Sequence, residues 1–228
     1  MSLEVERKYL DVDFEKLSLK LQQLGCLPES WHFESNIILD TQDASLYGQS
    51  KLLRLRKQEW ADKSSYILTF KAPVSEKDAR AEDIVDKIPV DPEKRDIKIR
   101  EELEIKIPDL ETMLKIFSGL GYEIWARYEK FRQTWRFPGK YVQSGRFPEP
   151  ELVLDILPFA NIVEIEGPEL FINQMEMNLG LDKFKKSSTN YHKLHQQWRQ
   201  ENCLPPQRDF IFESDERENL RKKLNLPV

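Results

Sequence analysis

Hydrophobic and polar residues alternate along several segments of the chain, as expected for strands that bury one face. Turn-forming Asp, Gly and Ser residues separate several of these segments, which supports the assignment. The predicted strands cover residues 3–10, 32–41, 51–60, 64–73, 99–108, 122–138, 151–157 and 161–167. The alternation therefore predicts a protein built largely of β-sheet.

Other segments repeat their hydrophobic residues every three or four positions, which is typical of helices. Asp13 and Asp109 stand where they could cap two of these helices, and Pro168 stands where it could open another. The predicted helices cover residues 13–25, 109–121, 168–180 and 189–201, with a further polar helix in the tail at 214–224. Strands and helices together predict an α+β fold.

Two stretches have no clear period. Residues 74–98 are rich in charge and contain Pro89 and Pro92, so they are predicted to form a long connection with room for a short strand at 83–90. Residues 138–150 contain Pro and Gly and are predicted to form a loop.

The charged residues of the predicted strands fall on one face. In a strand, residues two positions apart point to the same face and lie about 7 Å from each other. Odd and even positions, the two parities, therefore separate the side chains of each strand into two sets. The opposite parity is apolar, as in Val5, Leu55 and Ile165. The ionic parity contains Glu4, Glu6, Lys8, Arg54, Arg56, Lys71, Arg100, Glu102, Glu104, Lys106, Lys130, Arg132, Asp155, Glu164 and Glu166.

Two interpretations of this ionic face are open. In a single antiparallel strand, such a face is normally the side exposed to water. Across many strands, solvated faces usually mix Thr, Ser and Gln with charges, whereas here the strongest runs are almost wholly ionic and contain both signs. This pattern favours a barrel whose helices cover the apolar face and whose charged face lines the interior.

A charged interior needs a ligand, because buried charges must be paired or bound to ions. Clustered carboxylates without His or Cys suit hard cations such as Mg²⁺ or Mn²⁺. Arginines suit bidentate recognition of phosphate. A metal-bound polyphosphate would use both signs at once.

The overall composition narrows the class of partner. The net charge of −5 argues against binding to a nucleic acid polymer or to an anionic membrane. Cys26 and Cys203 are far apart and lack metal-ligand spacing, which fits a reducing, cytoplasmic setting. No long apolar run or basic leader is present, so neither a membrane span nor a signal peptide is expected.

Several motifs together point to a known family. "EVERK" at residues 4–8 is followed in order by "NIILDT", "LLRLR", "LTFK", "KFRQTW", "LVLDIL" and "VEIEGPEL". This series, over about residues 3–180, resembles the CYTH, or triphosphate tunnel metalloenzyme, superfamily, which includes class IV adenylyl cyclases, thiamine triphosphatases and inorganic triphosphatases. The resemblance implies an eight-stranded antiparallel closed barrel. We expect a tunnel domain at 1–202 and a peripheral, helical extension at 203–228.

The resemblance also implies roles for individual residues. The metal, Mg²⁺ or Mn²⁺, would be bound by Glu4, Glu6, Asp155, Glu164 and Glu166. The substrate would be bound by Lys8, Arg54, Arg56, Lys71, Lys130, Arg132 and Lys186. The residues expected to matter most for catalysis are Glu4, Glu6, Lys8, Arg56 and Glu166.

Some assignments stay open at this level. "KKSSTNY" offers Lys185 and Lys186 as competing matches to a family lysine, with Lys186 preferred. Either Glu102 or Glu104 fits the family's acid on the fifth strand. The connection at 74–98 and the tail have no evident family counterpart.

The expected function is metal-dependent hydrolysis of a small triphosphate, either inorganic, thiamine or nucleoside. Adenylyl cyclase is the main alternative, and a non-catalytic polyphosphate binder or a purely structural barrel are weaker ones. A homodimer is one option for the oligomeric state. His192, His195 and the tryptophans Trp60, Trp125, Trp135 and Trp198 are interpreted as packing or surface residues, because no third metal ligand lies near the histidines in sequence.

Overall fold

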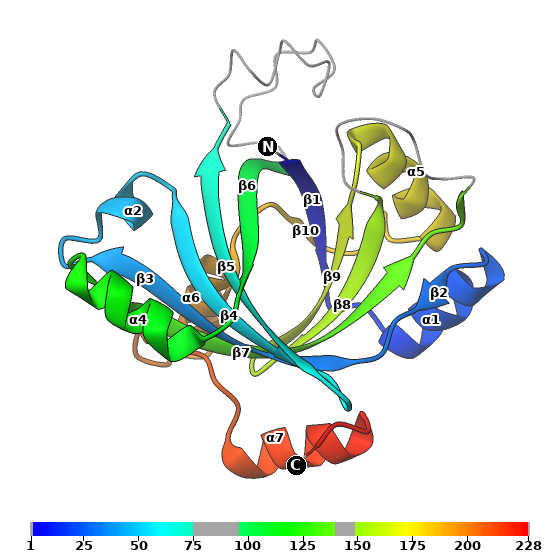
Figure 1. Ribbon diagram of the computed structural model, residues 1–228. Coiled ribbons are helices and arrows are strands. Elements are labelled where there is room, and N and C mark those ends of the chain that lie inside the picture. Colours follow the sequence, from blue (N-terminus) through cyan, green and yellow to red (C-terminus); the bar gives the residue numbers. More distant parts are fainter. Residues whose placement is uncertain (1, 75–95, 140–148, 228) are drawn as a thin grey trace.

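The centre of the protein is a sheet of antiparallel strands closed into a barrel (Figure 1). The computed structural model describes residues 2–74, 96–139 and 149–227. Eight strands form the ring in the order β1-β6-β5-β4-β3-β7-β8-β9, and β9 pairs back to β1. This arrangement confirms the predicted eight-stranded barrel. The strands are β1 (Ser2–Leu10), β3 (His32–Thr41), β4 (Leu52–Glu59), β5 (Ser64–Pro73), β6 (Lys98–Ile107), β7 (Tyr122–Arg136), β8 (Glu151–Leu157) and β9 (Ala160–Glu166), with the short β2 (Leu27–Pro28) and β10 (Lys186–Ser187) added to β7 and β1.

Helices cover the outside of the barrel. They are α1 (Phe14–Gln23), α2 (Ser45–Gly48), α4 (Leu110–Gly119), α5 (Glu169–Leu179), α6 (Tyr191–Glu201) and α7 (Ser214–Lys223). Asp13 and Asp109 cap α1 and α4 as predicted, since their carboxylates accept from the backbone N–H of Lys16 and Thr112. Pro168 occupies the cap position of α5, one residue before the helix begins.

The apolar face of the sheet is the outer one. Val5, Tyr9 and Ile165 on the barrel wall belong to one buried cluster with residues of α1 and α5 such as Leu17 and Ile172. A separate cluster lies on the opposite side, where Leu39, Leu53 and Leu55 of β3 and β4 are packed by residues of α4. The charged parity therefore points into the barrel, which confirms the interpretation of an ionic interior.

The C-terminal tail is part of the barrel wall. β7 pairs with β3 along most of its length but with β8 only from Phe131 to Arg136. Beside the part of β7 that β8 does not reach, Phe210 N donates to Arg127 O at 3.1 Å and Glu129 N donates to Phe210 O at 3.0 Å. Phe210 and Phe212 are both buried, while α7 lies at the lower end of the barrel (Figure 1).

The long elements begin and end within two residues of their predicted positions. The elements that the pattern missed are β2, α2 and β10, which are too short to display a period. The predicted strand at 83–90 lies outside the described residues, as does most of the predicted loop at 138–150.

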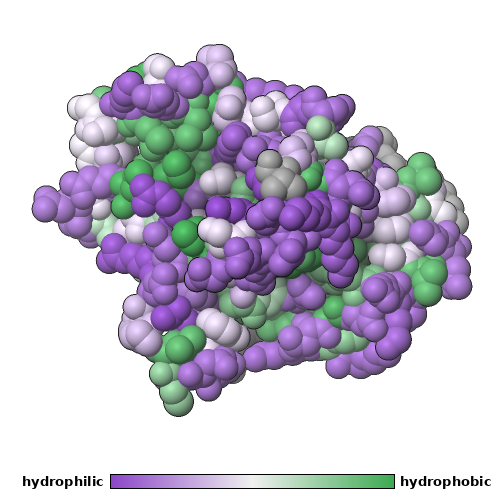
Figure 2. All heavy atoms as spheres, turned by 90° about the horizontal axis from the view of Figure 1, so that it is seen from below, coloured by the Kyte–Doolittle hydropathy of each residue, from purple (hydrophilic) through white to green (hydrophobic). Residues whose placement is uncertain are grey.

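The surface is mostly hydrophilic with separate hydrophobic areas, as the view from below shows (Figure 2). Large hydrophobic side chains are exposed on β6 and α4, among them Leu103, Ile105 and Ile116. Within the part of the chain that the structure describes, no helix is long and apolar enough to span a bilayer.

The role of the tail can be tested with two neighbouring residues. Phe210 is 3% exposed and Ile211 is 49% exposed. We expect Phe210→Ala to lower the free energy of unfolding by about 3 kcal/mol, because it removes a buried ring from between β7 and α6. Ile211→Ala should change it by less than about 0.5 kcal/mol. Urea unfolding of both variants would measure this, and equal effects would contradict the role assigned to the tail.

Candidate active site

The barrel encloses a cavity of about 400 Å³ whose walls are charged. Its lining contains side chains from most of the barrel strands, together with residues of α2 and α6. The charged residues of the strands that line it are Glu4, Glu6, Lys8, Arg54, Arg56, Lys71, Lys98, Arg100, Lys130, Arg132, Glu164 and Glu166.

The strand register brings these residues together. Glu6 of β1 is directly opposite Lys98 on β6 and opposite Glu166 on β9. Lys8 is opposite Glu164 in the same way. Because directly opposed residues of antiparallel strands share a face, the charges predicted by parity in separate strands become neighbours once the barrel closes.

Three carboxylates form an acidic cluster near one side of the cavity. Glu4, Glu6 and Glu166 each offer an oxygen, and these oxygens lie within 4.8 Å of one another. Burial raises the pKa of Glu166 well above its usual range, and the neighbouring Glu4 and Glu151 raise it further. Glu4 also has a buried carboxylate oxygen, Oε2, with no hydrogen-bond partner among the described residues. Such a group of oxygens fits a divalent cation such as Mg²⁺ or Mn²⁺.

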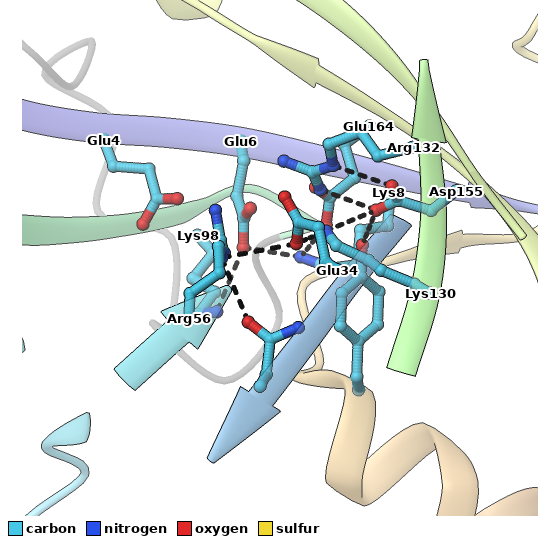
Figure 3. Close-up of polar contacts among 12 residues, drawn as sticks. Glu4, Glu6, Lys8, Glu34, Arg56, Lys98, Lys130, Arg132, Asp155 and Glu164 are labelled. Atoms are coloured by element: carbon cyan, nitrogen blue, oxygen red, sulfur yellow. Dashed lines mark hydrogen bonds and ion pairs between the residues drawn. The ribbon is translucent and has the colours of Figure 1, made fainter. Parts of the chain in front are cut away.

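Lysines form ion pairs with carboxylates of the acidic cluster. Glu6 Oε1 lies 2.5 Å from Lys8 Nζ and 3.0 Å from Lys98 Nζ. Burial would raise the pKa of Glu6, but the two lysines and Lys71 together hold it well below its usual range. Glu4 is paired with Lys71 at 2.5 Å. The carboxylates that could bind a metal are therefore next to the ammonium groups that could bind phosphate (Figure 3).

A second group of charges lies farther along the tunnel. Arg132 donates to Asp155 through Nε at 2.7 Å and through Nη2 at 2.6 Å, and the same Nη2 donates to Glu164 at 2.7 Å. Lys130 Nζ is 3.1 Å from the same Asp155 carboxylate. Burial would raise the pKa of Asp155, but Arg132 and Lys130 lower it to about 2. This carboxylate orients two cations along the wall (Figure 3).

The arginines of β4 are held by polar partners that fix their direction. Arg54 donates to the Tyr128 hydroxyl at 3.0 Å and to Thr69 at 3.1 Å. Arg56 Nε donates to Asn36 Oδ1 at 3.0 Å, so the rest of its guanidinium group stays available to the cavity it lines. Planar guanidinium groups anchored in this way are suited to phosphate oxygens.

Most of the predicted site residues line this cavity, but four do not. Asp155 lies behind Arg132 and Lys130, as described above. Glu102 pairs with Lys71 of the neighbouring strand β5 at 3.0 Å. Glu104 accepts from Thr69 at 2.6 Å and lies 3.5 Å from Arg54. Lys186 is opposite Tyr9, on the outer face of the barrel, where its ammonium group pairs with Glu176 at 2.6 Å. The structure therefore does not bring Lys186 into the tunnel.

The structure adds residues that the sequence reading did not select. Lys98 was assigned to the irregular connection before the strand. Glu34, fully buried, lies 3.3 Å from Arg56 and 3.5 Å from Lys130, and the alternation in residues 32–41 could have revealed it. Tyr191 was interpreted only as a helix residue, yet its hydroxyl donates to Asp155 and its ring lies within 5.5 Å of Lys8 Nζ.

Comparison with known proteins identifies the family of the chain. Residues 2–197 match the CYTH domain family. The chain belongs to the CYTH family. A curated relative, the putative adenylate cyclase of Methanocaldococcus jannaschii, is 28% identical over 134 residues. That match covers 59% of this chain and 64% of the relative.

Solved structures share the CYTH fold. A putative adenylate cyclase from Vibrio parahaemolyticus superposes with a TM-score of 0.60 at 18% identity, covering 85% of this chain and 98% of that one. A putative adenylyl cyclase from Hippeastrum, described as having a dominant triphosphatase activity, has a TM-score of 0.55 at 16% identity and covers 91% of this chain and 100% of that one. At these identities, the likeness shows the fold alone.

The acidic cluster makes a prediction about pH and metal. Glu166 has a raised pKa, so the folded protein binds more protons than the unfolded chain between the ordinary value of 4.5 and that raised pKa. Without metal, Glu166 should therefore cost stability as pH rises through this range. We expect Glu166→Gln to raise the metal-free free energy of unfolding at pH 7 and to weaken Mn²⁺ binding by about tenfold or more.

Urea unfolding with and without Mn²⁺, at pH 5 and pH 7, measures both effects. In the unaltered protein, Mn²⁺ should stabilise more at pH 7 than at pH 5, because the metal must displace the proton. Glu15→Gln, on the exposed surface of α1, is the matched control and should behave like the unaltered protein. Equal stabilisation by Mn²⁺ in Glu166→Gln would exclude Glu166 from the metal site.

Proposed function

We propose that this CYTH protein is a divalent-metal-dependent triphosphatase that removes the terminal phosphate of a small triphosphate. The observation that carries the proposal is the acidic cluster of Glu4, Glu6 and Glu166 beside a wall of lysines and arginines in one cavity. A metal site alone would not need the cations, and a phosphate site alone would not need the carboxylates. A metal-bound triphosphate accounts for both.

In this proposal, the acidic cluster binds Mg²⁺ or Mn²⁺, which when bound would neutralise phosphate oxygens and orient a water molecule. Glu164 pairs with Lys8, which also pairs with the acidic cluster. Asp155 would act indirectly, by orienting its two cations. The phosphate oxygens are bound by Lys8, Arg54, Arg56, Lys71, Lys98, Lys130 and Arg132. The outer position of Lys186 argues against direct phosphate contact in this arrangement.

The chemistry is phosphoryl transfer by positioning and electrostatics. Water attacks the terminal phosphorus, the bond from that phosphorus to the bridging oxygen breaks, and the products are orthophosphate and a diphosphate. Arg56 and Lys130 stabilise the charge that develops on the oxygens of the transferred group. Closure of the barrel around the cavity keeps these groups in a low-dielectric setting, which strengthens their effect.

Adenylyl cyclase is the second candidate, favoured by the name of the relative from Methanocaldococcus jannaschii. In that reaction, the ribose 3′-hydroxyl attacks the α-phosphorus of ATP and pyrophosphate leaves. The described activity of the Hippeastrum protein supports hydrolysis as the better first proposal within this fold. A non-catalytic polyphosphate binder has less support, because binding alone would not require the acidic cluster.

Two neighbouring residues of β4 test the proposal. Arg56 faces the cavity, whereas Lys57 points outward and pairs with Glu59 at 3.1 Å. We expect Arg56→Ala to lower kcat/KM for triphosphate by about a hundredfold or more, because it removes a charge from the phosphate site. Lys57→Ala should stay within about twofold of the unaltered protein.

The assay supplies tripolyphosphate, ATP and thiamine triphosphate with Mg²⁺ or Mn²⁺ and measures orthophosphate, pyrophosphate and cyclic AMP. Orthophosphate without cyclic AMP supports the triphosphatase, whereas cyclic AMP with pyrophosphate would replace it by the cyclase. Full activity in Arg56→Ala would remove the tunnel from the mechanism.

A further inference from the structure

One part of the cavity wall is aromatic rather than ionic. Tyr47 of α2, Trp125 at the start of β7 and His192 of α6 line the same cavity as the charged strands, together with the aliphatic Ile38 and Leu52. Phosphate oxygens gain nothing from such a surface. The proposed triphosphatase reaction therefore does not use this part of the site.

The aromatic residues come from three elements, and Tyr47 and Trp125 stack while the His192 ring is tilted against Trp125. The ring centroids of Tyr47 and Trp125 are 4.9 Å apart with an interplanar angle of 24°. Trp125 also lies 5.2 Å from the His192 ring. Because α2, β7 and α6 are distant in sequence, the stack exists only when the barrel and its covering helices are assembled.

The position of Tyr47 is fixed although its side chain is accessible. The buried Asp40 carboxylate accepts from the backbone N–H of Leu46 at 2.9 Å and of Tyr47 at 2.8 Å, and so holds α2 against the barrel. Tyr47 is nevertheless 45% exposed. A large aromatic side chain held on a fixed turn, at the edge of a cavity, offers a face on which a planar ligand can stack.

The charged side chains that line the cavity next to this stack are positive. The Arg208 guanidinium lies 5.1 Å from the centre of the Trp125 ring, and Lys51 and Lys193 also line the cavity. The carboxylates of the lining, in contrast, belong to β1 and β9. A neutral ring suits this surface better than a cationic one.

We infer that the substrate of the site is a nucleoside triphosphate whose base stacks on the exposed Tyr47, beside Trp125, while its phosphates extend toward the acidic cluster. The inference rests on the proposed function and selects among its substrates. Inorganic tripolyphosphate has no group to occupy the aromatic surface. Thiamine triphosphate carries a cationic thiazolium ring, which Lys51 and Lys193 of the lining and the nearby Arg208 disfavour by charge repulsion.

The first test compares substrates and variants. The unaltered protein should hydrolyse ATP with a higher kcat/KM than thiamine triphosphate. Tyr47→Ala should lower kcat/KM for ATP by about tenfold and leave that for tripolyphosphate within about twofold, because only ATP has a base to stack. Tyr47→Phe keeps the ring and should restore the ATP value. Tyr66→Ala, on the outer face of β5, is the matched control and should change neither substrate.

The second test measures binding without relying on turnover. Stacking of a base on Tyr47, next to Trp125, should quench tryptophan fluorescence when ATP and Mg²⁺ are mixed with the protein in a stopped-flow instrument. The quench should be smaller in Trp125→Phe, and tripolyphosphate should produce none of comparable size. Melting temperatures of all variants would show that each is folded.

The outcomes separate this inference from the proposed function. If tripolyphosphate and ATP are hydrolysed and Tyr47→Ala affects both equally, the triphosphatase stands and the base subsite is wrong. If ATP quenches Trp125 but no triphosphate is hydrolysed, the subsite stands and the triphosphatase is wrong. Two further results would overturn the subsite. One is faster turnover of thiamine triphosphate than of ATP, and the other is an ATP-induced quench of tryptophan fluorescence that is unchanged in Trp125→Phe.

Discussion

The structure depends on one constraint, which is the pairing of charges inside a closed barrel. Removing an ammonium or carboxylate group from water costs several kcal/mol unless an opposite charge is close. Here the buried Lys8 lies between Glu6 and Glu164, and Arg132 lies between Asp155 and Glu164. Each strand must keep its register for these pairs to form. The hydrophobic clusters under the helices supply the stability that such an interior does not.

The same pairing explains how the tunnel can accept a ligand of mixed charge. In the structure, the carboxylates and cations of the wall neutralise one another. Under the proposed function, a metal ion would take the place of the lysines around Glu4 and Glu6, while phosphate oxygens would take the place of the carboxylates around those lysines. Binding would then exchange one set of ion pairs for another and leave few buried charges uncompensated.

Much of the fold and the site could be predicted from the sequence, because alternation is a local property of each strand. Parity alone selected Glu4, Lys8 and Arg56, since the charged face is strongly ionic along whole strands. Lys98 was missed because it adjoins a stretch with no period. The outward position of Lys186 could not be predicted, because β10 has only two residues and the pairing of Lys186 with Tyr9 is fixed by tertiary structure. The aromatic stack was also beyond the sequence, since three distant elements build it.

The tail residues beside β7 have a consequence for association between molecules of the folded protein. The part of β7 that extends past β8 would otherwise present unpaired backbone N–H and C=O groups along a strand edge. Bare edges of this kind recruit strands from other molecules and start aggregation. By pairing at Phe210, the tail covers part of this edge. A fragment that ends at the family boundary near residue 197 would then face its greatest difficulty in remaining monodisperse at high concentration, whatever its intrinsic stability.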